Sequence, residues 1–118
     1  MGNRRMMSKT VTQTQRFLTL PIEAQALYFH MLQNTDDDGV CEAYMLLRLT
    51  GLKVDTLQTL ENSELVTELN NECVYHVTDF REQNYIDMRR YNQSKYADLL
   101  DDHGILTTQE YYEMEEED

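Results

Sequence analysis

The last part of this sequence, residues 98–118, contains no lysine and no arginine, although it carries nine carboxylates. The first twenty residues are the opposite case, because they carry four cations and no acidic residue. Residues 1–60 hold six basic and six acidic side chains, so residues 61–118 account for the whole formal net charge of −12. An acidic surface repels a phosphate backbone and attracts basic protein surfaces. The C-terminal part is therefore a candidate for binding protein rather than nucleic acid.

Glycine, cysteine and long apolar runs are also scarce, and each shortage argues against a class of function. Four glycines leave no glycine-rich phosphate loop, and no serine, cysteine or histidine stands in a recognisable nucleophile motif. Cys41 and Cys73 lack metal-ligand spacing, and without a secretory signal we expect two reduced, packed thiols rather than a disulfide. No apolar run approaches the ~18 residues of a membrane span, and none follows the first arginines as in a secretory signal. We expect a soluble, cytoplasmic, non-enzymatic protein with no catalytic residue, cofactor, metal or membrane partner.

The acidic run Asp36-Asp37-Asp38-Gly39 is the motif that most resembles a metal site. A calcium loop alternates oxygen ligands over twelve residues and closes with a bidentate glutamate, but the twelfth residue here is Leu47. His30, His76 and His103 have no cysteine or histidine partner at zinc spacing. We therefore expect the acidic run to form a turn that caps the next helix.

Periodicity and turn residues predict one domain at residues 9–97, with a mobile basic arm at 1–8 and an acidic C-terminal extension at 98–118. The expected elements are a strand at 9–11, a helix at 13–18 capped by Thr12, a helix at 21–33 opened by Pro21, a strand rung at 40–41, a helix at 42–49, a helix at 56–62 capped by Asp55, strands at 65–69 and 73–77, and a helix around 110–114. Asn70-Asn71 is the expected hairpin turn, because asparagine tolerates positive φ.

Helix, rung, helix, helix and hairpin is the element order of a winged helix-turn-helix. The predicted fold class is therefore mainly α with a small β hairpin (α+β), followed by the acidic extension. One core is expected, built from Leu27, Met31, Leu46, Leu49, Leu57, Leu60, Val66 and Val77.

Two stretches carry the candidate nucleic-acid-binding residues. They are Arg4, Arg5, Lys9 and Arg16 in the first stretch, and Tyr85, Arg89, Arg90, Tyr91 and Lys95 in the second. Cations interleaved with aromatic rings suit phosphate contacts and base stacking, although a tyrosine-rich strap that closes the core explains the second stretch equally well. Lys53 begins the candidate recognition helix 53–62, which also holds Asp55 and Glu61 and is at least as well explained as a purely structural helix.

Six short stretches, in order along residues 4–91, match the pattern of one known domain family. They are Arg5-Met6-Met7-Ser8-Lys9, Phe17-Leu18-Thr19-Leu20-Pro21, Gln25-Ala26-Leu27-Tyr28-Phe29-His30-Met31, Asp36-Asp37-Asp38-Gly39-Val40, Asn84-Tyr85-Ile86 and Arg89-Arg90-Tyr91. On these residues the sequence resembles the N-terminal winged-helix domain of phage replisome organiser proteins, the replication initiators of phages of low-GC Gram-positive bacteria. The resemblance implies a non-enzymatic protein in the bacterial host cytoplasm that binds duplex DNA or replisome proteins, and it leaves a homodimer open.

The charge pattern supports a second hypothesis, in which the same fold has turned its surface acidic. Such a protein would be an acidic phage inhibitor, anti-CRISPR-like or a nucleic-acid mimic, that binds a basic groove on a host nucleic-acid-binding protein. The candidate partner-binding residues are Asp98, Asp101, Asp102, Glu110, Glu113, Glu115, Glu116, Glu117 and Asp118. A solubilising tail is the simpler explanation of the same carboxylates.

Overall fold

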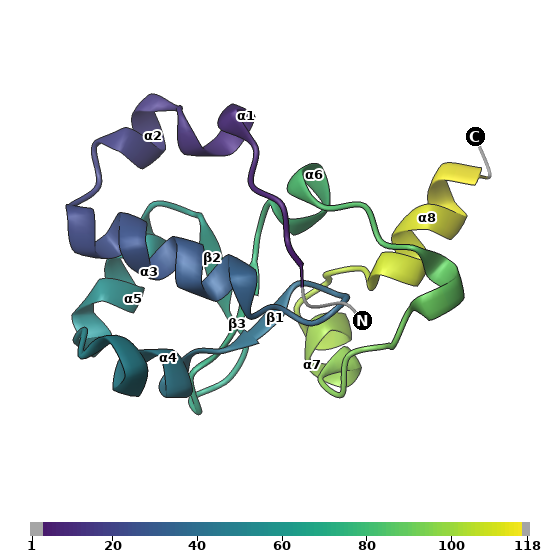
Figure 1. Cartoon of the computed structure of the whole chain (residues 1–118). Helices are drawn as coiled ribbons and strands as arrows, with labels where there is room; N and C mark the ends of the chain where they lie inside the picture. Colours follow the sequence, from purple (N-terminus) through teal and green to yellow (C-terminus); the bar gives the residue numbers. More distant parts are fainter. Residues whose placement is uncertain (1–3, 117–118) are drawn as a thin grey trace.

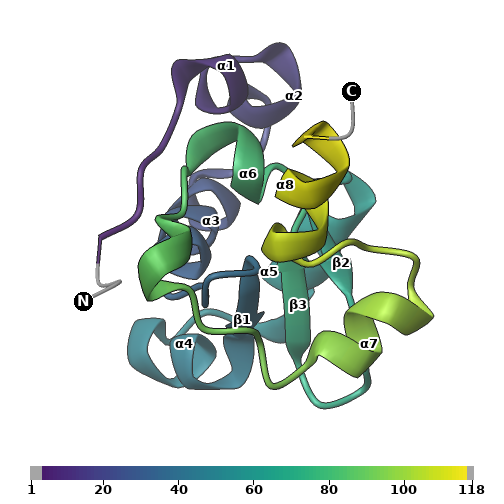
Figure 2. The same cartoon turned by 90° about the vertical axis from the view of Figure 1, so that its right-hand side faces the viewer.

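Helices α3, α4 and α5 pack against one face of a three-stranded antiparallel sheet, and the C-terminal part of the chain covers the other face (Figure 2). The structure is a computed structural model that describes residues 4–116. The central elements are α3 (Ile22–Gln33), β1 (Val40–Glu42), α4 (Ala43–Thr50), α5 (Val54–Asn62), β2 (Val66–Glu68) and β3 (Val74–Val77) (Figure 1). Strand β3 lies between β1 and β2. The predicted α+β class is confirmed.

Local signals explain most of the helix boundaries in this central part. Pro21 precedes α3 by one residue, and Gly51 ends α4 in a left-handed conformation with φ of 75°, which glycine adopts without steric cost. The expected capping of α5 by Asp55 is wrong, because α5 begins after Lys53 and Asp55 lies inside its first turn. An acidic side chain there still favours the helix, since a helix N-terminus carries a partial positive charge.

The hairpin of β2 and β3 is confirmed, but its turn differs from the expected one. The paired residues are Val66 with Val77, Thr67 with His76 and Glu68 with Tyr75. The residue with positive φ is Cys73, at 62°, and neither Asn70 nor Asn71. Asn70 contributes through its side chain instead, because its Oδ1 accepts a hydrogen bond from the backbone N–H of Glu72 at 2.8 Å.

The main core lies between the three central helices and the sheet. Seven of the eight expected core residues are buried there, namely Leu27, Met31, Leu46, Leu57, Leu60, Val66 and Val77. The eighth, Leu49, is 72% exposed, and the prediction that it points inward is wrong. Helix α4 is short and buries the face of Ala43 and Leu46. Leu47 is partly buried beside them, and Leu49, in the last turn, lies about 120° around the helix from Ala43, beyond the edge of the buried face.

Residues 5–20 wrap across the central helices and are held in place. The strand expected at residues 9–11 and the cap expected at Thr12 are both wrong. Two short helices form here, α1 (Lys9–Thr12) capped by Ser8 and α2 (Gln15–Leu18) capped by Thr14 (Figure 1). Each capping hydroxyl accepts a hydrogen bond from a backbone N–H of the first turn, which satisfies a donor that has no partner inside the helix.

The basic arm is also not mobile in its described part. The backbone N–H of Met6 donates to Oδ1 of Asn84 at 2.6 Å, and that of Ser8 donates to Oε1 of Gln83 at 3.0 Å. Arg5 pairs with Asp37 at 3.0 Å. These contacts span at least 32 residues of sequence, so no local pattern indicated them. Residues 1–3 of the predicted arm lie outside the described residues.

The C-terminal part forms four further elements and belongs to the packed structure. They are α6 (Phe80–Gln83), the 3-10 helix η1 (Met88–Arg90), α7 (Ala97–Asp102) and α8 (Thr108–Glu116). Leu100 of α7 is fully buried against Val40, Leu69 and Val74 on the outer face of the sheet. The helix expected around residues 110–114 is confirmed with its capping box. Its hydrogen bonds run from Thr107 N–H to Glu110 Oε1 and from Glu110 N–H to Thr107 Oγ1.

His76 of β3 is buried on this outer face, and its Nε2 has no hydrogen-bond partner within residues 4–116. Burial, together with the nearby Arg81 charge, lowers the pKa of His76 to about 4, compared with about 6.5 in an unfolded chain. Between these two values the unfolded state binds more protons than the folded state. Folding stability must therefore fall as the pH drops from about 6.5 towards 4.

We predict that acidification from about pH 7 to about pH 5 lowers the free energy of unfolding of the native chain by ~2 kcal/mol more than that of the His76→Gln variant. The measurement is urea denaturation at each pH, and comparison of the two differences cancels the titration of the carboxylates. His30→Gln, which changes an exposed histidine, is the control and should keep the native pH dependence. Identical pH dependence in the native and His76→Gln proteins would contradict the assignment.

Both thiols are free, as the sequence predicts, and Cys41 is buried. Burial raises the pKa of Cys41 to about 12, so this thiol stays protonated and unreactive at neutral pH. Across residues 4–116, every helix is too short or too polar to cross a membrane.

Candidate functional site

A buried carboxylate organises the turn at residues 36–39, which we call the acidic turn. The Asp38 side chain has no exposed surface. Its two oxygens accept hydrogen bonds from the Tyr91 hydroxyl at 2.7 and 2.9 Å, and from the backbone N–H groups of Ser94 and Thr108 at 2.7 Å each. Burial and this hydrogen bond raise the pKa of Tyr91, which keeps its phenol protonated as a donor. One side chain thus fixes the strap after η1 and the start of α8.

The other two carboxylates of the acidic turn are also used within the chain. Oδ1 of Asp36 accepts from the backbone N–H of Val40 at 3.0 Å, and burial raises the pKa of Asp36. Asp37 pairs with Arg5 and accepts from the backbone N–H of Asn92 at 2.9 Å. The expectation that the turn caps the next helix is wrong, because β1 separates the turn from α4. The turn instead joins the two ends of the chain.

Gly39 closes the acidic turn in a position that only glycine can occupy. Its φ is 83°, and the Phe80 side chain lies 2.7 Å from the point where a Cβ would stand.

Within residues 4–116, no three His, Cys, Asp or Glu side chains are grouped so that they could hold a metal ion. The acidic turn is therefore best described as a structural junction.

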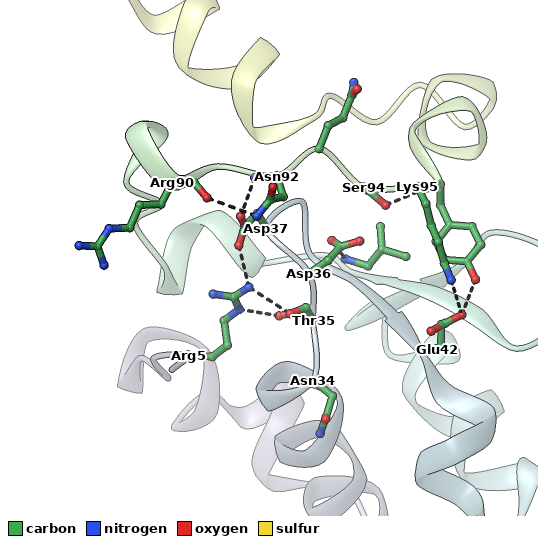
Figure 3. A pocket seen from close by; sticks show the side chains of 13 residues that line it. Arg5, Asn34, Thr35, Asp36, Asp37, Glu42, Arg90, Asn92, Ser94 and Lys95 are labelled. Atoms are coloured by element: carbon green, nitrogen blue, oxygen red, sulfur yellow. Dashed lines mark hydrogen bonds and ion pairs between the residues drawn. The ribbon is translucent and has the colours of Figure 1, made fainter. Parts of the chain in front are cut away.

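A groove of about 880 Å³ opens beside the acidic turn (Figure 3). Arg5 and Asp37 form one of its walls. On the opposite wall, Lys95 and Tyr96 both reach the carboxylate of Glu42, with 3.4 Å between Nζ of Lys95 and Oε2 of Glu42. The other exposed polar side chains of the lining are Asn34, Arg90, Asn92 and Gln93. The three amides were not predicted from the sequence, because uncharged residues contribute nothing to a charge pattern.

Next to this groove, the two predicted nucleic-acid stretches come together. Arg4 from the N-terminal segment and Arg90 from η1 line one small pocket of about 190 Å³, together with Tyr85. Tyr85 is 78% exposed. Arg89 is almost fully exposed and pairs with Asp87, which lines the same pocket. We call Arg4, Arg89, Arg90 and Tyr85 the arginine patch.

Other candidates of the two stretches do not join this patch. Lys9 lies on α1, and Arg16 on α2 pairs with Asp79 at 3.1 Å. Tyr91 is committed to Asp38, as described above. The strap explanation is therefore correct for Tyr91, whereas Tyr85 remains open to solvent.

The exposed face of α5 and the hairpin tip provide little positive charge. Lys53 stands at the start of α5 and is exposed, but Asp55 follows it on the same helix. At the hairpin, Glu68 and Glu72 are both exposed. Such carboxylates repel a phosphate backbone. A base-reading helix normally also supplies arginine or lysine side chains, and this face offers Lys53 alone among the described residues of α5 and the hairpin tip.

The candidate partner-binding carboxylates lie on two separate helices. Asp98, Asp101 and Asp102 are on α7, and Glu110, Glu113, Glu115 and Glu116 are on α8, and all seven are exposed. Glu110 is also the capping residue of α8. Glu117 and Asp118 lie outside the described residues. Leu100 holds α7 against the sheet and Thr108 holds the start of α8 to Asp38, so the helix backbones that carry these carboxylates have defined positions.

Comparison with protein-family models, with curated proteins and with solved structures finds no match to this chain.

Proposed function

We propose that this chain is a non-enzymatic winged-helix protein of the phage replication-organiser kind that contacts the backbone of duplex DNA through the arginine patch. The order α3, β1, α4, α5, β2, β3 and the sheet order β1-β3-β2 support the winged-helix assignment. The resemblance of residues 4–91 to replisome organisers supports the functional class.

One observation carries the proposal: Arg4 and Arg90, which are 86 residues apart in sequence, line the same pocket beside an exposed tyrosine. Guanidinium groups contact phosphate oxygens, and an exposed aromatic ring can stack on a base or pack on a sugar. The groove next to the patch adds the amide side chains of Asn34, Asn92 and Gln93, which suit hydrogen bonds to sugar and phosphate. The acidic surface elsewhere confines DNA to this patch.

The test is the salt dependence of duplex affinity, measured by fluorescence anisotropy between about 50 and 200 mM salt. Binding should weaken steeply with salt. Removal of two cations in the Arg4→Ala, Arg90→Ala double variant should weaken binding and reduce the slope of log K against log salt by about 2. The matched control is Lys9→Ala with Lys53→Ala, which removes the same charge from α1 and from the start of α5 and should leave the slope unchanged.

Two results would contradict this proposal. One is equal weakening by both double variants, because it would mean that net charge and not the arginine patch governs binding. The other is the absence of any binding at low salt by the folded protein, which would leave protein binding as the function.

A second candidate function is that of an acidic inhibitor that occupies a basic groove on a host nucleic-acid-binding protein. The observation that favours it is the rigid placement of α7 and α8, since Leu100 and Thr108 attach these helices to the sheet and to Asp38. Carboxylates on folded helices can match a basic surface without the cost of ordering the backbone on binding. A solubilising tail would need no such attachment.

A further inference from the structure

A second groove, of about 650 Å³, is lined by residues of α8 and of the chain from α6 to η1. These elements lie in the right-hand part of Figure 1. We call this second groove the tyrosine groove. It is lined by Met6, Arg81, Glu82, Gln83, Asn84, Tyr85, Met88, Tyr111, Tyr112, Glu115 and Glu116. Only Tyr85 is shared with the arginine patch, so the two sites are otherwise separate.

The tyrosine groove presents apolar side chains to solvent. Met6 is 61% exposed and Met88 is 36% exposed. The rings of Tyr85 and Tyr112 lie against each other, with 5.6 Å between their centroids. Exposed methionines adapt to varied apolar partners, and tyrosines provide large contact area with little loss of conformational freedom. This combination is typical of a surface that binds protein.

Internal contacts hold the aromatic walls of the groove in place. The hydroxyl of Tyr112 accepts a hydrogen bond from the backbone N–H of Ile86 at 3.1 Å. The guanidinium of Arg81 lies 4.6 Å from the centroid of the Tyr111 ring and donates to the backbone carbonyl of Leu106 at 3.0 Å. The groove therefore exists before any partner arrives, which lowers the entropic cost of binding.

The rim of the groove is acidic. Glu82, Glu115 and Glu116 are exposed at its edges, and Arg81, the single cation of the lining, is already engaged. This charge repels phosphate. It also repels a second copy of this chain, which carries a net charge of −12. A ligand that fits both the apolar floor and the rim must combine apolar side chains with positive charge.

We propose that the tyrosine groove docks a basic amphipathic segment of a partner protein. The apolar side chains of that segment occupy the floor made by Met6, Met88 and the tyrosines. Its lysines or arginines pair with the glutamates of the rim. Docking of an amphipathic segment in an apolar groove, with oriented charges at the edge, is an established mode of peptide recognition.

The probe for this site is a fluorescein-labelled amphipathic helical peptide of leucine and lysine, about four turns long. Two matched peptides are needed, one with every lysine replaced by glutamate and one with the same composition in a scrambled order. Fluorescence anisotropy with the full chain should show binding of the amphipathic leucine–lysine peptide and no binding of the glutamate peptide. The scrambled peptide should bind at least about tenfold more weakly, because it presents no continuous apolar face.

The decisive variants change the rim and the floor separately. Glu115→Lys with Glu116→Lys should weaken the leucine–lysine peptide about tenfold or more, and Met88→Glu should weaken it to a similar degree. The matched control is Asp101→Lys with Asp102→Lys, which makes the same charge change on α7 and should alter affinity by less than about twofold. All five changed positions are exposed, and circular dichroism should show the native spectrum in each variant.

Three outcomes would overturn the proposal. One is an equal loss of affinity in the α7 control, which would indicate general attraction to an acidic protein. Another is equal binding of the scrambled peptide. The last is concentration-dependent self-association that Met88→Glu abolishes, because a second copy would then be the occupant. The Arg4→Ala, Arg90→Ala variant should bind the peptide normally, so failure of this proposal and failure of the DNA proposal are distinguishable.

Discussion

Replacement of Asp38 by alanine should lower the free energy of unfolding by ~3–5 kcal/mol, because it breaks a buried hydrogen-bond network. The carboxylate is completely buried and accepts from Tyr91, Ser94 and Thr108. Its removal leaves the backbone N–H groups of Ser94 and Thr108 buried without a partner, and each such group costs ~1–3 kcal/mol. The effect is large because this one buried side chain holds both later segments to the turn, where the remaining polar links include the contacts of Asp37 with Asn92 and Thr108.

Urea denaturation followed by circular dichroism measures this change, with Asp98→Ala as the control. Asp98 is an exposed carboxylate on α7, and its loss should change stability by less than ~0.5 kcal/mol. Hydrogen exchange gives a second, local readout, since the amides of Ser94 and Thr108 should lose protection first. An Asp38→Ala protein that is as stable as the control would show that the acidic turn does not hold the C-terminal segment.

The elements that the sequence predicted correctly are those specified by neighbours in the chain. Helix α3 follows from apolar spacing after Pro21, and the β2–β3 hairpin follows from two β-like runs around Asn70. The start of α8 follows from the reciprocal capping of Thr107 and Glu110. Each of these signals is local. It consists of about four consecutive residues, or of apolar residues that recur with the period of a helix or a strand.

The elements that the sequence mispredicted depend on contacts far along the chain. The acidic turn was expected to serve α4, but Asp38 binds residues 53 to 70 positions later. Residues 98–118 suggested a solvated tail because their carboxylates dominate the composition. One buried leucine, Leu100, was enough to place part of that stretch on the sheet. A single leucine hardly changes the composition of an acidic segment, but its burial decides where that segment packs.

The candidate site also combines residues that the sequence predicted with residues that only the fold reveals. Sequence identified Arg4 and Arg90 as nucleic-acid candidates for separate reasons, and the tertiary structure brought them to one pocket. Arg5 looked equivalent to Arg4, but its side chain pairs with Asp37 and is only 6% exposed. Nothing in the local sequence distinguishes two adjacent arginines. The amides that line the neighbouring groove and the tyrosine groove beside α8 likewise arise only from folding.

Removal of residues 98–118 should destabilise the whole domain by more than ~5 kcal/mol, a loss comparable with the total stability of a small domain. The truncation removes Leu100, and loss of a buried leucine side chain alone costs ~2–5 kcal/mol. It also deletes the Thr108 N–H that Asp38 requires and exposes Val40, Leu69 and Val74 to water. Thermal melting and urea denaturation should therefore show a protein without a cooperative transition, or with a strongly lowered one.

Neutralisation of the exposed carboxylates in residues 98–118 tests the role of their charge without removing the side chains that pack on the sheet. The matched variant keeps the full chain and changes Asp98, Asp101 and Asp102 to Asn, and Glu113, Glu115 and Glu116 to Gln. All six side chains are exposed, so this variant should fold with native stability or gain a little from reduced self-repulsion.

If the chain is an inhibitor of a basic host protein, the folded variant should lose that partner in a nuclease-treated pull-down, whereas its affinity for duplex DNA should rise. A cooperative, stable truncation would contradict the packing role of Leu100. Unchanged capture of the same partner by the neutral variant would instead leave the carboxylates as solubilising groups.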